Sequence, residues 1–185
     1  AHIEAGLRSF NRLMPEEINR VLSDHSSDLL LCPTTTAVAN LQREGIQRGV
    51  YHVGDVMYDA TLDARMRSRD RSAVATGYDL ADIRYTLVTI HRAENTDSAE
   101  RLSEVIAYVR DQAAGDRLVL PMHPRTRRFV ADAGIDLSDF IVMEPVGYLD
   151  MHGLIDNAVE VMTDSGGVQK EAYFHGKPCV TLRDE

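Results

Sequence analysis

Short apolar runs alternate with helical patterns along most of the chain. Seven runs of four to six residues are rich in Val, Leu and Ile and are bounded by turn or polar residues: "DLLLC", "VYHV", "YTLVTI", "RLVLPM", "FIVME", "AVEVM" and "CVTL". Runs of this length and composition are typical of strands that are buried on both faces of a parallel sheet.

Helical periodicity separates these runs. The stretch "PEEINRVLSDHS" places Pro15 at a first helical position, puts acids in the first turn, and brings Ile18, Val21, Leu22 and His25 to one face. Similar patterns predict helices at "TTTAVANLQREG", "SAERLSEVIAYVRDQ" and "RTRRFVADAG". Repeated alternation of strand and helix implies right-handed crossovers, so the sequence predicts an α/β fold of the doubly wound class.

One region interrupts the alternation. From Asp55 to about Tyr78 the sequence has helical spacing and then polar residues, with no strand pattern. We therefore expect a domain boundary between positions 54 and 63, which divides residues 1–55 from residues 56–185. The chain also opens without Met and stops soon after an apolar run, so we expect it to be an excerpt of a longer protein.

Composition narrows the classes of function. The 185 residues are 44% hydrophobic and carry a formal net charge of -9, which argues against a nucleic-acid binder or a membrane-surface binder. The sequence shows neither a membrane-spanning run nor a signal peptide, so we expect a soluble cytoplasmic protein with small-molecule or protein partners. Cys32 and Cys179 lie on apolar runs, where we expect reduced, buried thiols.

The stretch "TDSGGVQKEA" follows a predicted strand directly and opens a predicted helix. Ser165 can cap that helix, while Gly166 and Gly167 leave the backbone bare, so an anionic group can approach the unpaired N–H donors. Glu171 lies about one turn further on and can accept hydrogen bonds from a ribose diol. The alternative is an ordinary capped helix whose glycines only serve the turn.

Basic residues follow two other predicted strands. His91 and Arg92 come directly after "YTLVTI", and His123 and Arg125 come directly after "RLVLPM". The carboxyl ends of parallel strands share one edge of a sheet, which is where ligands bind in such folds. Together with the glycine turn, these side chains predict a diphosphate site.

Carboxylates lie near the start of the chain. Glu4 ends an apparent strand in "HIEAGLR", and Glu16 and Glu17 occupy the first turn of the helix in "PEEINR". Acids at that position also complement the helix dipole, which is the alternative explanation for the pair. Carboxylates on both segments would suit proton transfer at a sugar carbon.

Five motifs occur together and in order: "HIEAGLRSF", "PEEINR", "VTIHRAEN", "TDSGGVQKEA" and "GKPCVTLRDE". Over essentially its whole length the chain resembles the non-hydrolysing UDP-N-acetylglucosamine 2-epimerases. The resemblance implies two Rossmann-like domains that face each other across a cleft, as in GT-B glycosyltransferases. Residues 1–55 then form the C-terminal part of the first domain, and residues 56–185 form most of the UDP-binding second domain, truncated at its C-terminus.

The family resemblance also implies the chemistry. UDP is eliminated to give a 2-acetamidoglucal and is then added back, with a proton delivered to C2 from the other face. Glu4 and Glu16 match carboxylates implicated in acid–base work, His91 matches the histidine near the diphosphate, and Ser165 with its glycines matches the phosphate turn. The reaction is redox-neutral and the sequence has no G-x-G-x-x-G fingerprint, so no nicotinamide cofactor is expected, and no metal is expected either. A homodimer is the expected assembly.

Two features depart from the family pattern, and several alternatives stay open. Met151 stands near where an aromatic residue is expected to pack on the uracil, although Met also offers a soft apolar surface. "HRAEN" indicates a branch whose substrates include diacetamido uronic acid nucleotides. A hydrolysing epimerase, a GT-B glycosyltransferase and a non-catalytic nucleotide-sugar-binding module are the remaining alternatives. Further catalytic residues are expected upstream of Ala1 and beyond the "RDE" segment, so turnover by this excerpt alone stays open.

Overall fold

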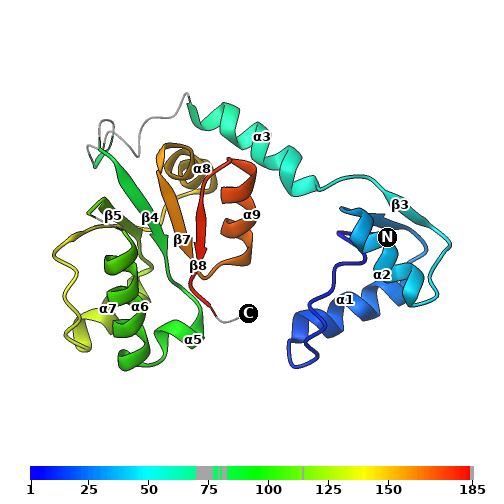
Figure 1. The fold of residues 1–185 in the computed structure, drawn as a ribbon, viewed down its shortest axis with the longest axis horizontal. Helices are drawn as coiled ribbons and strands as arrows, with labels where there is room; N and C mark the ends of the chain where they lie inside the picture. The colour runs from blue at the N-terminus through cyan, green and yellow to red at the C-terminus, as the bar shows by residue number, and fades with distance from the viewer. Residues whose placement is uncertain (70–76, 79, 81–82, 114, 184–185) are drawn as a thin grey trace. The chain divides into compact units, whose positions relative to one another are not determined.

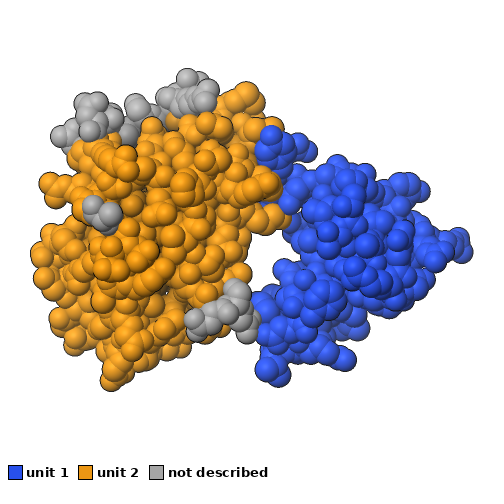
Figure 2. Space-filling view, viewed as in Figure 1, with its two compact units in different colours: residues 1–59 blue, residues 60–185 orange. Residues whose placement is uncertain are grey.

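Parallel strands form two separate sheets in the computed structural model. The structure describes residues 1–69, 77–78, 80, 83–113 and 115–183. The sheets belong to two units, Ala1–Asp59 and Ala60–Glu185, which Figure 2 colours separately. The assignment of these units to the two Rossmann-like domains stays a prediction.

The first unit is a short α/β segment. Its strands β1 (His2–Ile3), β2 (Leu30–Cys32) and β3 (Val50–His52) lie in that order, and α1 (Pro15–Ser26) and α2 (Thr35–Arg43) form the two connections (Figure 1). A small core of buried side chains joins the elements: Ala5, Leu30, Cys32, Ala37 and Leu41. The periodicity therefore located both helices, and α1 begins and ends at the predicted residues.

One glycine of this unit is required by close packing. Gly6 has a φ of +78°, and a Cβ built there would lie 2.3 Å from the backbone oxygen of Ala37 at the start of α2. Any side chain would collide with that carbonyl and would also strain the backbone. The turn after β1 can therefore pack directly against α2.

The second unit contains a five-stranded sheet in the order β6-β5-β4-β7-β8, with every neighbouring pair parallel. The strands are β4 (Tyr85–Thr89), β5 (Arg117–Pro121), β6 (Phe140–Met143), β7 (Glu160–Thr163) and β8 (Cys179–Thr181). The helices after β4 are α5 (Ala93–Thr96), α6 (Ala99–Gln112), α7 (Pro124–Asp132), α8 (Tyr148–Asn157) and α9 (Gly166–Phe174). The doubly wound α/β prediction is confirmed.

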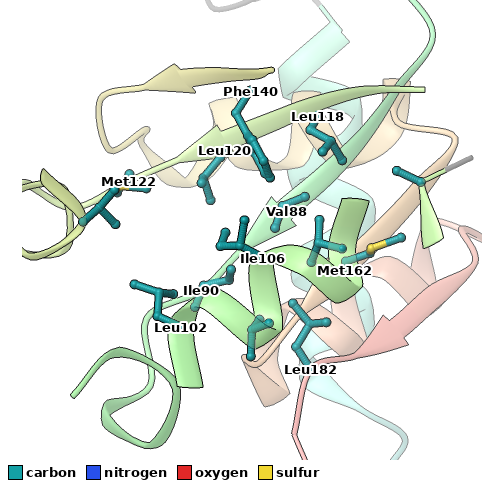
Figure 3. Close-up of a cluster of buried hydrophobic side chains, with 14 residues drawn as sticks. Val88, Ile90, Leu102, Ile106, Leu118, Leu120, Met122, Phe140, Met162 and Leu182 are labelled. Atoms are coloured by element: carbon teal, nitrogen blue, oxygen red, sulfur yellow. The ribbon is translucent and has the colours of Figure 1, made fainter. Parts of the chain in front are cut away.

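Helices cover both faces of this sheet. Val88 and Met162 point to one face and pack with Leu102 and Ile106 of α6 in the cluster that Figure 3 shows. The alternate strand residues point the other way: for example, Leu87 packs in a second cluster with residues of α8 and α9. Because successive strand residues alternate in direction, a strand between two helical layers is buried at every position and is mostly apolar.

Burial on both faces holds for the central strand and fails at the edges. Every residue of β4 is buried, whereas β8, at the end of the strand order, is exposed or partly exposed along its length. Cys32 is a buried free thiol as expected, but the expectation for Cys179 is wrong, because its position on β8 leaves it exposed.

The segment without a strand pattern is partly helical. The helix α3 (Val56–Arg69) spans the division between the units, and much of the polar stretch predicted after it falls on residues 70–76 and 79, outside the described residues. Sequence periodicity did not reveal α5 or α8. Within the described ranges, every helix is too short or too polar to cross a bilayer.

Candidate functional site

The strand order of the second unit creates a switch point between β4 and β7. From β4 the chain moves outward through β5 to β6, and it then returns to the other side of β4 to form β7 and β8. Crossovers that depart in opposite directions leave a crevice outside the carboxyl ends of the two central strands, and ligands bind there in open α/β sheets. Residues that follow β4 and β7 therefore come together at the place where a ligand is expected.

A buried carboxylate joins the ends of these two strands. Asp164 follows β7 and is 0% exposed. It accepts hydrogen bonds from the backbone N–H groups of His91 (3.1 Å) and Arg92 (3.0 Å), directly beyond β4, and from the side-chain amide of Asn95 (3.1 Å). The same amide donates to the carbonyl oxygen of Leu182 at 2.8 Å, so the segment after β8 is tied to the cluster as well.

The same carboxylate orients His91. The Nδ1 atom of His91 lies 2.8 Å from Oδ1 of Asp164, and the imidazole side chain is 59% exposed. A carboxylate beside Nδ1 fixes the ring and favours the proton on that nitrogen. Nε2 is then the nitrogen that can meet a ligand at the switch point.

The start of α9 presents bare backbone at the neighbouring strand end. The hydroxyl of Ser165 accepts from the N–H of Val168 at 3.4 Å and so caps the helix. A Cβ on Gly166 or Gly167 would meet no atom closer than 3.9 and 3.8 Å, respectively, so packing within the chain requires neither glycine. Glycine lowers the stability of a helix, and the packing of this chain does not explain why two of them stand here. This favours the close approach of a ligand over the alternative of an ordinary capped turn.

The other predicted binding residues lie on the same unit. Glu171 is on α9, about one turn beyond the glycines, and Met151 on α8 is partly buried against the cluster beneath that helix. Arg92 is partly exposed after β4, and His123 is exposed after β5. The side chain of Arg125 lies outside what the structure describes.

The predicted acids of the first unit differ sharply from one another. Glu4 directly follows β1 and has a φ of +66°, a left-handed conformation that is rare for a residue with a side chain and is often found at functional sites. Glu16 is exposed in the first turn of α1.

Glu17 has a structural role. It is 3% exposed, and its carboxylate accepts hydrogen bonds from the N–H groups of Ser9 (2.9 Å) and Phe10 (3.0 Å). Burial opposes ionisation of Glu17, but these hydrogen bonds outweigh it and lower the pKa. The two adjacent glutamates are therefore not equivalent, since Glu17 anchors the loop before α1 whereas Glu16 is exposed.

The structure thus brings part of the predicted set together. His91, Arg92, Ser165, Gly166 and Gly167 gather at the ends of β4 and β7. Glu4 and Glu16 belong to the first unit. Within the described residues, no group of three or more His, Cys, Asp or Glu side chains is arranged to hold a metal ion.

Sequence reasoning missed two residues of this site. Asp164 and Asn95 lie inside the quoted motifs, "TDSGG" and "HRAEN", but no role was assigned to them. The available signal was an acid between a buried strand and a helix cap, because a charge at such a position must find partners on the neighbouring strand end.

Strand order, layers and the glycine turn at the switch point place the second unit in the Rossmann-like class of α/β domains. A family model described as UDP-N-acetylglucosamine 2-epimerase matches residues 1–185. The chain belongs to this family.

Curated relatives match the whole chain. It is 48% identical over 189 residues to the UDP-2,3-diacetamido-2,3-dideoxy-D-glucuronate 2-epimerase of Pseudomonas aeruginosa, covering 100% of this chain and 52% of that protein. It is 47% identical over 191 residues to a UDP-N-acetylglucosamine 2-epimerase homolog of Methanococcus maripaludis, covering 100% of this chain and 53% of the homolog. The chain thus spans about half the length of these relatives.

A solved structure gives the same result. The UDP-GlcNAc 2-epimerase of Methanocaldococcus jannaschii, in complex with UDP-GlcNAc and UDP, superposes with a TM-score of 0.85 at 41% identity. The match covers 100% of this chain and 53% of that one. Its GT-B arrangement of Rossmann-like domains agrees with the predicted fold class.

The Asp164 cluster generates a stability prediction. Asp164→Asn keeps the size of the side chain but removes the charge and turns one acceptor into a donor beside the N–H groups of His91 and Arg92. We expect a loss of about 2 kcal/mol or more in the free energy of unfolding, measured with denaturant, because buried donors lose a charged partner. Asp116→Asn is the control, since Asp116 pairs with an exposed Arg84; it should change stability by less than about 1 kcal/mol. Equal effects of the two substitutions would contradict the structural role of Asp164.

Proposed function

We propose that the protein containing this chain interconverts UDP-N-acetylglucosamine and UDP-N-acetylmannosamine without hydrolysis. The observation that carries the proposal is the cluster at the ends of β4 and β7, where Asp164 holds His91 beside the capped, glycine-bearing start of α9. Backbone N–H groups at a helix start donate to phosphate oxygens, and Nε2 of His91 can donate as well when the imidazole carries both protons. The family membership and the relatives support the same activity.

The proposed reaction is an elimination followed by an addition. A base takes the proton from C2, the bond from C1 to the UDP oxygen breaks, and a 2-acetamidoglucal forms. UDP then adds back to C1 while an acid returns a proton to C2 on the opposite face, so atoms and electrons balance without a redox step. We assign the diphosphate to His91, Arg92, Ser165 and the two glycines, because negative charge grows on the leaving oxygen and donors there stabilise it.

The remaining roles follow from the first unit and from α8 and α9. We assign the proton transfers to Glu4 and Glu16. The strained backbone of Glu4 and the exposure of Glu16 support these roles, whereas the buried Glu17 is occupied by its loop. Glu171 would accept hydrogen bonds from the ribose, and Met151 would offer an apolar surface to the uracil.

A second substrate is favoured by one comparison. The P. aeruginosa diacetamido-glucuronate enzyme, at 48% identity, stands level with the 47% identical homolog of M. maripaludis and above the 42% identical UDP-N-acetylglucosamine 2-epimerases of two methanogens. A UDP-2,3-diacetamido uronic acid is therefore the alternative substrate for the same C2 chemistry.

Proton NMR in deuterated water tests the activity. We expect the intact protein, incubated with UDP-GlcNAc, to produce UDP-ManNAc with deuterium at C2, because the proton on C2 exchanges with solvent during elimination. Free ManNAc with UDP would instead indicate a hydrolysing enzyme. An unchanged spectrum calls for the same assay on the diacetamido uronic acid nucleotide, and no exchange with either sugar would refute C2 epimerisation.

A substitution in the glycine turn should affect folding and binding in opposite directions. Gly166→Ala finds room in the fold, because its nearest neighbour would be an Arg183 atom at 3.9 Å. Helix propensity predicts unchanged or higher stability, by up to about 1 kcal/mol. UDP affinity, measured by calorimetry, should fall at least tenfold because the methyl group occupies the space of the phosphate. Gly176→Ala, at the far end of α9 with a φ of +68°, is the control and should spare affinity while lowering stability; unaltered UDP affinity in Gly166→Ala would disprove the phosphate assignment.

Adjacent glutamates provide a matched pair for catalysis. Glu16→Gln should reduce C2 exchange by at least a hundredfold while UDP affinity and stability stay near wild type, because an exposed acid–base group is lost without a structural bond. Glu17→Gln should lower stability, since it weakens the hydrogen bonds from Ser9 and Phe10. Exchange kinetics and thermal unfolding of both variants distinguish these effects, and a wild-type exchange rate in Glu16→Gln would remove Glu16 from the mechanism.

A further inference from the structure

Two buried histidines lie behind the proposed ribose-binding residue. His152 of α8 is 0% exposed, and its Nδ1 atom lies 2.8 Å from Nε2 of His175, which directly follows α9. The Nδ1 atom of His175 lies 3.1 Å from Oδ1 of Asp156, and Nε of Arg65 lies 2.8 Å from the same oxygen. These side chains form a continuous chain of polar contacts from α3 through α8 to the end of α9.

The chain of contacts fixes where the protons lie. The Asp156 oxygen that contacts Nδ1 of His175 also contacts the guanidinium of Arg65, which can only donate, so this oxygen acts as an acceptor and Nδ1 of His175 is the donor to it. Burial lowers the pKa of His175, although Asp156 opposes that effect, and burial together with His175 lowers the pKa of His152 to about 4. Both rings are then neutral, Nε2 of His175 accepts from Nδ1 of His152, and Nε2 of His152 is left with a lone pair.

That lone pair faces Glu171. Nε2 of His152 lies 3.7 Å from Oε1 of Glu171, and it has no hydrogen-bond partner among the described residues. A charged carboxylate cannot satisfy a lone pair, whereas a protonated carboxyl group can donate to it. Glu171 is only 12% exposed, and burial raises its pKa, which favours the same protonated form.

We propose that His152 is a positioning residue that holds Glu171 as a neutral carboxyl group until a ribose replaces it as hydrogen-bonding partner. In the free protein the Glu171 hydroxyl donates to Nε2 of His152. When a nucleotide binds, the proton leaves to solvent, and the carboxylate turns to accept from the ribose hydroxyls. His175 and Asp156 act behind His152 by fixing its tautomer. This inference rests on the proposed ribose-binding role of Glu171.

Other charged groups share this neighbourhood. They come from three elements and include Asp63 and Arg65 on α3, Tyr148 and Asp156 on α8, and Lys177 after α9. Tyr148 also packs edge-on against the ring of His152, with centroids 4.4 Å apart. None of the contacts described for these groups places a proton donor on Nε2 of His152, so the exchange between Glu171 and His152 is the step to test.

A substitution of His152 should remove the pH dependence that Glu171 gives to nucleotide binding. In His152→Gln an amide NH₂ group can donate to Glu171, which favours the carboxylate, so nucleotide binding should lose its need for proton release. We expect the ratio of the UDP-GlcNAc dissociation constants, wild type over variant, to rise as the pH falls from 8 to 4.5. The rise should reach up to tenfold per pH unit in the range between the protonation midpoint of Glu171 in the free wild type and its midpoint in the variant. Titration of the other groups is common to both proteins and cancels in this ratio.

Tyr148→Phe is the matched control, because it keeps the ring against His152 and removes only the phenolic hydroxyl group. Its dissociation constant should follow the wild-type pH profile. A wild-type to His152→Gln ratio that stays constant over the pH range would show a merely structural role for His152 and overturn the proposal. Failure of UDP-GlcNAc to bind the wild type at any pH would overturn the proposed function and this inference together.

A second measurement does not depend on the folding of a variant at position 152. Carbon-13 NMR of the side-chain carboxyl groups in the intact wild-type protein, with the Glu171 signal assigned by its loss in Glu171→Gln, follows the protonation of this group directly. We expect a midpoint above that of an ordinary glutamate in the free protein and a lower midpoint with UDP-GlcNAc bound. An ordinary midpoint in the free protein, or one that UDP-GlcNAc leaves unmoved while binding, would overturn the proposal.

Discussion

The second unit depends on a single buried carboxylate. Asp164 sits at 0% exposure between the two central strands of the sheet, where an ionised group is tolerated only if donors surround it. Its donors come from the segment after β4 and from Asn95, and Asn95 in turn reaches the carbonyl of Leu182 after β8. The requirement to satisfy one charge therefore sets the path of the chain beyond three strands and the direction of the His91 ring.

Local patterns of the chain were sufficient for most of the fold. Each of the seven apolar runs coincides with a strand to within a few residues, and α1 was located to the residue. Buried parallel strands and a Pro-initiated amphipathic helix leave strong periodic signals. The pattern of α8 is weaker, since Gly153 and two acids interrupt its apolar positions, and α5 has only four residues. The exposure of Cys179 depends on which strand ends the sheet, and this is a property of strand order rather than of the local sequence.

The site was predictable only as far as its residues are contiguous. The helix start is predicted by a contiguous motif, Ser165, Gly166 and Gly167. The partners of Asp164, by contrast, lie 69 to 73 residues away along the chain. The glutamates at positions 16 and 17 look alike in sequence, and only the loop that folds onto Glu17 distinguishes them. His152 and His175 are separated by 23 residues and have no periodic signal, so nothing in the sequence indicated that the two imidazoles form a hydrogen bond.

The helix α9 shows how these separate constraints meet in one element. Its first turn has glycines that contribute nothing to packing, and its later turns hold a buried carboxyl group that would be costly if charged and unpaired. In the proposed function one nucleotide would use both features, with its phosphate oxygens at the first turn and its ribose hydroxyls at Glu171. A helix built for its own stability would carry alanines and an apolar residue at these positions. The proposed nucleotide site therefore accounts for both features of α9, which the stability of the helix alone does not.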